Sequence, residues 1–147
     1  MPANHFQVFD LLADSVMLNY LRKDKIMIIN KKTVNNRDIA IINSTELLIT
    51  DVQSALDLIM SVKYETGCTD IAINKETFTE DFFILSTRLA GEILQKYINY
   101  GVRLAIYGDF SKYTSKPLKD FIYESNMGKD FYFQKNEELA VKMLAQY

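Results

Sequence analysis

Histidine is almost missing from this chain of 147 residues, and cysteine is just as scarce. His5 is the only histidine and Cys68 is the only cysteine. Histidine carries out most general acid-base catalysis and completes most nucleophile pairs. These two counts therefore exclude a Ser-His or Cys-His catalytic pair, a histidine-rich zinc site and an internal disulfide.

Sequence motifs for nucleotide binding and hydrolysis are also lacking. The chain contains no G-x-S-x-G, no G-x-x-x-x-G-K-[ST] and no G-x-G-x-x-G. Cys68 follows Gly67, and with no histidine available to lower its pKa we interpret it as an inert small residue. We predict no catalytic residue, no metal site and no cofactor.

Charge and hydrophobic runs exclude two further classes of partner. The net charge is -2, with none of the basic excess expected of a nucleic-acid-binding domain. Apolar runs such as IMII and ELLI are far shorter than the ~20 residues that span a bilayer. Asp10 and Asp14 interrupt the apolar N-terminal stretch, which is atypical of a secretory signal. We predict a cytoplasmic protein that binds neither nucleic acid nor membrane.

The N-terminal segment has apolar residues at helical spacing. Phe9, Leu12, Val16 and Tyr20 predict an amphipathic helix over residues 6–20. One interpretation is a terminal helix docked on the domain or on a second copy. The other is that residues 1–26 are not part of the natural protein, because codons for residues 22–24 can form a ribosome-binding sequence ahead of Met27. We divide the chain into a helical extension (1–26) and an α/β domain (27–147).

Strands and helices alternate after Met27. KIMIINKK and RDIAIINS, joined across Asn35 and Asn36, predict a β-hairpin. The segments that follow predict a helix from Asp51 to Gly67, a strand DIAIN, a helix over about 82–100, a strand VRLAIYG, a helix from Ser115, a strand DFYFQ and a helix from Asn136. This order predicts a single-domain mixed sheet of about five mostly parallel strands with helices packed on it.

Several long stretches resemble a known family. LITDVQSALDLI, YETGC, EDFFILSTRLAGEILQKYINYGVRLAIYGDFS and SKPLKDFIYESN are similar to a bacterial family known as domain of unknown function 4180, over about residues 27–144. The order of elements also resembles the STAS-like fold of anti-sigma-factor antagonists. That second resemblance implies a regulatory module acting through a protein partner.

The resemblance to anti-sigma-factor antagonists implies a phosphorylation site. In those proteins a serine near the start of the helix before the penultimate strand is phosphorylated, and the phosphate ejects the partner. Ser86 and Thr87 lie close to that point here, although ILSTRL replaces the Asp-Ser-Ser-Gly context. The alternative is that these hydroxyl groups lie on the helix surface or cap the helix.

Polar residues follow two of the predicted parallel strands. Ligands collect at the carboxyl ends of such strands. We therefore name Asn74, Glu76, Asp109, Ser111 and Lys112 as candidate ligand-binding residues. The alternative is that Asp109 and Ser111 only satisfy the backbone of their turn, as short polar side chains often do.

Two functional hypotheses follow. The first is a non-enzymatic, STAS-like regulatory or protein-interaction module with an unidentified protein partner. The second is a small-molecule-binding protein or an atypical enzyme with a polar site at the strand ends. An exposed edge on KIMIIN and the predicted N-terminal helix also favour a homodimer.

Overall fold

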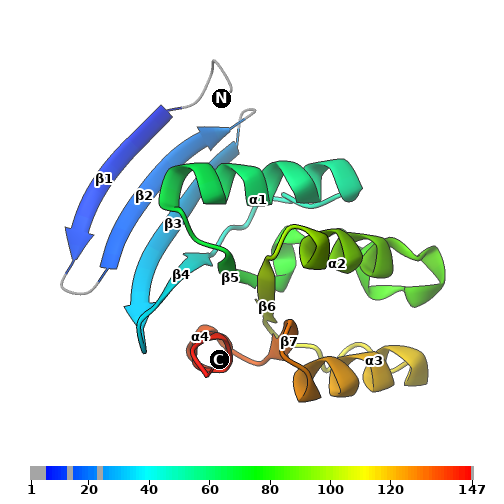
Figure 1. Cartoon of the computed structure of the whole chain (residues 1–147). Helices are drawn as coiled ribbons and strands as arrows, with labels where there is room; N and C mark the ends of the chain where they lie inside the picture. The colour runs from blue at the N-terminus through cyan, green and yellow to red at the C-terminus, as the bar shows by residue number, and fades with distance from the viewer. Residues whose placement is uncertain (1–5, 13–14, 23–24, 147) are drawn as a thin grey trace.

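The computed structural model describes residues 6–12, 15–22 and 25–146, with side chains from residue 28 onward. One sheet holds all seven strands in chain order (Figure 1). The strands are β1 (Phe6–Leu12), β2 (Ser15–Arg22), β3 (Lys25–Val34), β4 (Arg37–Ile42), β5 (Asp70–Asn74), β6 (Arg103–Tyr107) and β7 (Phe131–Gln134). The pairs from β1 to β4 are antiparallel and those from β4 to β7 are parallel. Strands β3–β7 confirm the predicted five-stranded, mostly parallel sheet.

The predicted N-terminal helix is wrong. Residues 6–12 and 15–22 form β1 and β2, and β2 pairs with β3 over eight residues, from Ser15 opposite Lys32 to Arg22 opposite Lys25. The physical reason is that β3 is ten residues long and would otherwise leave a row of backbone groups unpaired. The edge of KIMIIN that we expected to be exposed is therefore covered within the chain.

Local signals predicted most of the other element boundaries correctly. Asn35 and Asn36 have φ values of 52° and 64°, the left-handed conformation of a tight hairpin turn between β3 and β4. Asp51 accepts a hydrogen bond from the Ser54 backbone at the start of α1 (Val52–Thr66), and Gly67 ends that helix at φ 74°. Short-range capping chemistry therefore determines these boundaries.

Helix α2 begins later than the sequence predicts. It spans Leu89–Asn99, and the residues before it form two 3-10 turns, η2 (Glu80–Phe83) and η3 (Leu85–Thr87), separated by Ile84. Phe82 and Phe83 are buried there and pack edge to face, at 5.1 Å between ring centroids. Arg88 then adopts φ 67°, which separates η3 from the helix. Burial of two adjacent aromatic rings outweighs the helical spacing.

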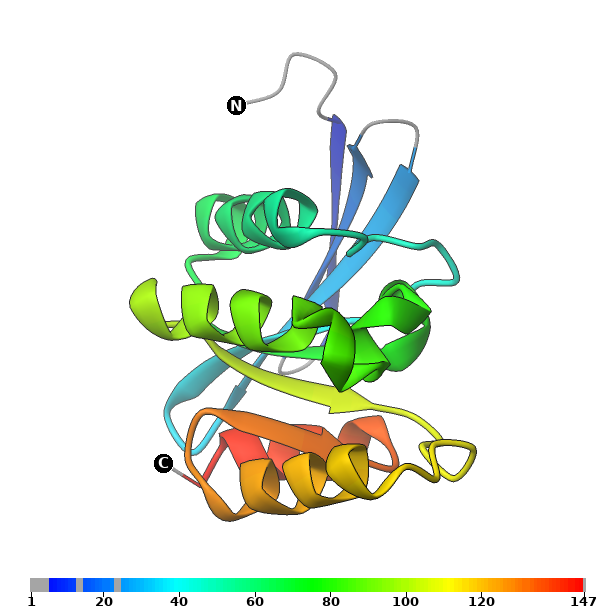
Figure 2. The same cartoon turned by 90° about the vertical axis from the view of Figure 1, so that its right-hand side faces the viewer.

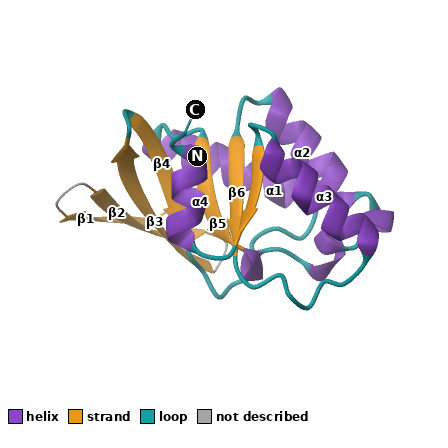
Figure 3. Cartoon of the chain, turned by 90° about the horizontal axis from the view of Figure 1, so that it is seen from below, coloured by secondary structure: helices purple, strands orange, loops and turns teal. Residues whose placement is uncertain are grey.

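The helices cover the parallel part of the sheet unequally. Helices α1, α2 and α3 (Lys116–Met127) lie side by side on one face, and α4 (Glu137–Leu144) packs on the other (Figures 2 and 3). On the α4 face the sheet presents the small residues Ala72 and Ala105, which let Ala140 of the helix approach closely. The predicted layering of helices on the sheet is confirmed.

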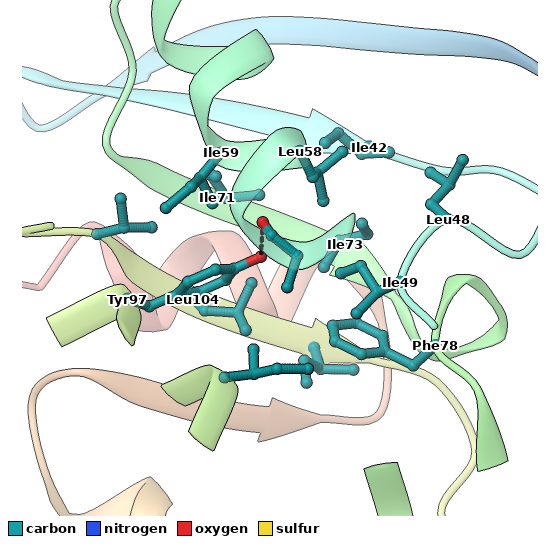
Figure 4. Packing of buried hydrophobic residues seen from close by; sticks show 14 of the residues in the cluster. Ile42, Leu48, Ile49, Leu58, Ile59, Ile71, Ile73, Phe78, Tyr97 and Leu104 are labelled. Carbon is teal, nitrogen blue, oxygen red and sulfur yellow. Dashed lines mark hydrogen bonds between the residues drawn. The ribbon is translucent and has the colours of Figure 1, made fainter. Parts of the chain in front are cut away.

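Strands β5 and β6 form the centre of the hydrophobic core. Ile71, Ile73 and Leu104 pack beneath α1 and α2, where the Tyr97 hydroxyl donates to the Ala55 carbonyl at 2.8 Å (Figure 4). Every residue of β5 is buried, which confirms that this apolar segment is covered on both faces. No helix in the described part of the chain has the length and hydrophobicity needed to cross a membrane.

Candidate functional site

The candidate ligand-binding residues lie at the carboxyl ends of β5 and β6. The two strands are parallel and adjacent, with Asn74 opposite Tyr107. The segment after β5 turns through η1 (Lys75–Thr77), and the segment after β6 runs from Gly108 to Ser115 before α3 begins. This register brings the predicted residues to one edge of the sheet.

Asn74 holds two loops together. Its Oδ1 accepts from the Ser44 backbone N–H at 3.0 Å, and its Nδ2 donates to the Ser44 carbonyl at 2.7 Å. The same amide nitrogen lies 3.2 Å from Glu76 Oε1. The side chain is buried, so its amide groups are already used in fixing the loop after β4 to the end of β5.

Lys75 is central to this edge, although it is not among the predicted residues. Its side chain is only 13% exposed, and Nζ lies 3.4 Å from Glu76 Oε2 and 5.8 Å from the Tyr113 ring centroid. The aliphatic part of the side chain lies against Gly108, where a Cβ would come within 2.8 Å of Lys75 Cγ. Gly108 has φ 154° and makes room for this lysine. A glycine directly after a buried strand is the one signal in the sequence that could have indicated it.

Glu76 lies at the surface, with 53% of its side chain exposed. Burial alone would raise its pKa, but hydrogen bonds from its own backbone N–H, from Asn74 and from Lys75 lower the pKa below the usual 4.5. Glu76 is therefore a carboxylate at neutral pH, and Lys75 is its counter-ion.

Glu80 connects the segment after β5 to the segment after β6. Its partners are Lys112 and Tyr113, a contact that the sequence did not predict. Lys112 Nζ lies 3.1 Å from Glu80 Oε1, and the Tyr113 hydroxyl lies 3.1 Å from Oε2. Partial burial would raise the pKa of Glu80, but the hydrogen bonds from Lys112 and Tyr113 lower it. Burial and the Glu80 carboxylate raise the pKa of Tyr113, which stays a neutral donor. Sequence patterns could not place Glu80 opposite Lys112, since the two residues belong to separate loops.

Asp109 and Ser111 interact mainly with each other. Asp109 Oδ1 accepts from the Ser111 backbone N–H at 2.9 Å. Hydrogen bonds from the hydroxyl and the backbone N–H of Ser111 lower the pKa of Asp109. Both side chains are exposed, and this contact stabilises the turn after β6.

The charged groups at this edge form two ion pairs on either side of Tyr113. Glu76 is paired with Lys75, and Glu80 is paired with Lys112. No hydrogen bond or ion pair among the described residues joins Glu76, Asp109 and Lys112 to one another. In residues 6–12, 15–22 and 25–146 no three His, Cys, Asp or Glu side chains lie together as potential metal ligands. The Glu80–Lys112 pair is exposed on both sides, whereas Lys75 is largely covered and lies against the Tyr113 ring, which Lys112 also contacts.

Cys68 lies away from this edge, at the opposite ends of the strands. It is buried, and its thiol points to the Thr66 carbonyl at 3.9 Å. Burial raises the pKa of this thiol, so that the reactive thiolate is disfavoured.

Ser86 and Thr87 lie in η3, just before α2, and their hydroxyl groups differ. Thr87 Oγ1 lies 2.8 Å from both the Asp81 and Ile84 carbonyls and accepts from the Leu89 backbone N–H at 3.3 Å. Ser86 is exposed, and within the described residues its hydroxyl has no hydrogen-bond partner. It borders a surface cleft of about 420 Å³ that Lys112, Ser115 and Leu85 also line. The Thr87 hydroxyl is therefore used in holding the turn together, whereas the Ser86 hydroxyl is free to be modified.

The comparison with family models matches residues 34–144, from the end of β3 to the end of α4, to the family described as domain of unknown function (DUF4180). The chain belongs to the DUF4180 family. This confirms the predicted resemblance to DUF4180, over residues 34–144 where about 27–144 was expected, and all the site residues described above lie inside the matched region. Neither the curated proteins nor the solved structures contain a match to this chain.

The limits of the DUF4180 match coincide with features of the fold. Strands β1 and β2 and nearly all of β3 precede residue 34, whereas the parallel strands and all four helices follow it. The family motifs therefore describe the layered α/β part of the molecule.

Proposed function

We propose that this chain is a non-enzymatic, STAS-like regulatory module that binds a partner protein in the cytoplasm. The observation that carries the proposal is the exposed hydroxyl of Ser86 beside the start of α2. Helix α2 leads into β6, the penultimate strand, which is the place of the phosphorylated serine in anti-sigma-factor antagonists. The order of the five strands β3–β7 and the four helices also supports a STAS-like fold.

The state of the strand-end residues supports binding of a protein rather than chemistry on a small molecule. Glu76 and Lys112 are each more than half exposed and each already has a partner. A catalytic or ligand-binding site needs polar groups that converge on one point inside a sheltered cavity. Paired charges on an open surface are typical of a protein-protein contact rim.

Ser86 is the proposed site of phosphorylation, and Thr87 is the structural neighbour. A phosphate on Ser86 would lie near the N-terminus of α2 and close to Arg88, where negative charge is stabilised. Lys112 lines the same cleft. Modification would therefore leave the domain folded while changing the charge that a partner meets.

The partner is proposed to be a protein, and neither nucleic acid nor a membrane is proposed as a ligand. The net charge of -2 supports this choice over nucleic acid. A homodimer also remains part of the proposal, although neither feature that motivated it is found: β3 is paired with β2, and residues 6–12 and 15–22 form strands instead of the predicted helix.

The test is to purify the chain from its native host and measure phosphate on Ser86 together with any protein that copurifies. Ser86→Asp is expected to release a copurifying protein while leaving the melting temperature unchanged. Thr45→Asp adds the same charge at another exposed hydroxyl residue and is expected to retain that protein. Retention of the protein by Ser86→Asp, or equal release by both variants, would contradict the proposal.

A small-molecule site at the strand ends is the second candidate, and Lys75 is the observation that favours it. A lysine that is 13% exposed at the carboxyl ends of parallel strands is an unusual feature. Thermal-shift measurements with small carboxylates and inorganic phosphate would test it. Stabilisation that Lys75→Met abolishes would support a ligand site, and no stabilisation by any of these anions would count against it.

A further inference from the structure

The outward face of α2 lies in a groove of about 640 Å³. Val52 at the start of α1 and Phe121 of α3 flank it, and Leu85 of η3 closes the end nearest Ser86. These three side chains are partly buried and pack against the core, so the groove has apolar walls anchored in the fold. Helices α1 and α3 lie on either side of α2 in Figure 2.

Gly91 lines this groove, and no contact among the described residues requires a glycine there. It lies within α2, where glycine is disfavoured relative to alanine. A Cβ at this position would meet nothing within 4 Å. Glycine on an open helix face lets another backbone or a large side chain approach closely. The open space above Gly91 is therefore suited to a partner.

The charges along the groove have no partners in the described residues. Arg88, just before α2, and Glu92 and Lys96 within it are spaced four residues apart, and among the described residues no ion pair or side-chain hydrogen bond joins them to each other or to their neighbours. Nearby surface charges on α3 behave differently, since Lys116 pairs with Asp120 at 2.6 Å. The groove therefore presents two unpaired cations and one unpaired anion.

The charges of the groove argue for its occupant. Arg88 and Lys96 give the groove one more cation than anion, which favours a partner element that carries carboxylates, whereas a second copy of α2 would bring the same excess of positive charge. A single amphipathic helix is the element whose apolar ridge fills a groove between helices.

We propose that this groove binds an amphipathic helix of the partner protein. A small apolar residue of that helix would face Gly91, and its carboxylates would face Arg88 and Lys96. This inference rests on the proposed function, because it assigns the docking surface of the same partner. Leu85 lines both this groove and the cleft beside Ser86. A phosphate on Ser86 would then lie next to an acidic helix and repel it.

Site-specific photo-crosslinking in the native host tests the groove. The full chain carries p-benzoylphenylalanine in place of Gln95, which lines the groove, or in place of Lys142 on α4 as the control. The expected result is one adduct from position 95 and none from position 142, with the crosslinked peptide lying in an amphipathic helix rich in Asp and Glu. A crosslinked peptide from a strand or loop, or from a second copy of this chain, would overturn the proposal.

Two substitutions of Gly91 test the groove quantitatively, by measuring the affinity of each variant for the captured protein. Gly91→Ala is expected to raise the melting temperature by about 2–4 °C because it favours the helix, yet to bind the captured protein more weakly. Gly91→Trp is expected to weaken binding by about tenfold or more by filling the groove. Lys96→Glu is expected to weaken binding, while Lys142→Glu on α4 leaves it unchanged.

The outcomes also separate the groove from the proposed function. If a protein copurifies and Ser86→Asp releases it, but the Gly91 variants bind it as wild type does, the groove proposal fails and the regulatory function stands. If no protein copurifies and position 95 gives no adduct, both fail.

Discussion

The two ends of the parallel strands carry charged clusters of opposite character. At the amino ends, Asp70 is buried and accepts from Arg37 at 2.9 Å and from Arg103 at 3.3 Å. Arg103 also donates to the carbonyls of Lys129 and Leu144. At the carboxyl ends, Glu80 and Lys112 pair in the open, each more than half exposed.

Of these two clusters, the buried one around Asp70 stabilises the fold. Burying a charge is costly unless it is paired, so the Asp70 cluster holds β4, β5, β6 and the end of α4 in one arrangement. Exposed pairs contribute little to stability and can exchange partners freely. The carboxyl edge is therefore the edge that can change its contacts.

The largest expected effect is at Asp70. Asp70→Asn leaves Arg37 and Arg103 beside a group without charge. Breaking a buried ion pair costs about 3–5 kcal/mol, and since water can reach the partly exposed Arg37 we expect the lower value, a loss of about 3 kcal/mol in the free energy of unfolding. Urea denaturation measures it. Glu80→Gln at the other edge should cost about 1 kcal/mol or less in the same measurement. Equal losses for the two variants would contradict the comparison.

The next effect is at Gly108, which makes room for Lys75. Gly108→Ala places a methyl group 2.8 Å from Lys75 Cγ at a φ of 154°, and we expect a loss of about 1–3 kcal/mol in the free energy of unfolding. Gly128→Ala is the control, because its φ is -91° and its nearest atom is 3.5 Å away. Urea denaturation of both variants checks the result, and a neutral Gly108→Ala would mean that Lys75 is not held by this contact.

The smallest effect is the pH dependence contributed by Glu80. Its pKa in the folded state is below the usual 4.5, so its ion pair stabilises the fold above that pH and the stabilisation is lost as the pH falls through the folded pKa. The melting temperatures of wild type and Glu80→Gln should therefore differ most at neutral pH and converge in acid. If the difference between the two melting temperatures grew on acidification, the pKa of Glu80 would be raised and not lowered in the folded state.

The sequence predicted those parts of the fold that depend on neighbouring residues. Asn35 and Asn36 make the hairpin turn, and Asp51 and Ser115 cap helices through their own side chains. Strands β1 and β2 could not be predicted in this way. Their apolar residues also fit a helical spacing, and the pairing of β2 with β3 is a contact between segments that no local pattern reports.

The candidate site was predictable only in its location. The carboxyl ends of β5 and β6 follow from the parallel order, but the roles of Lys75, Glu80 and Tyr113 depend on side chains from three segments meeting in space. The difference between Ser86 and Thr87 likewise could not be predicted. It arises because the 3-10 turns bring the carbonyls of Asp81 and Ile84 to the Thr87 hydroxyl.

We propose that the segment at Ser86, and not the charged edge at Lys75, is the functional surface. The most direct measurement compares the affinity of the protein captured from the host for two variants of this chain, Ser86→Asp and Lys75→Met. We expect a loss of about tenfold or more for Ser86→Asp, on the scale of a charge placed in an interface, and wild-type affinity for Lys75→Met. Wild-type affinity for Ser86→Asp together with a loss for Lys75→Met would contradict it.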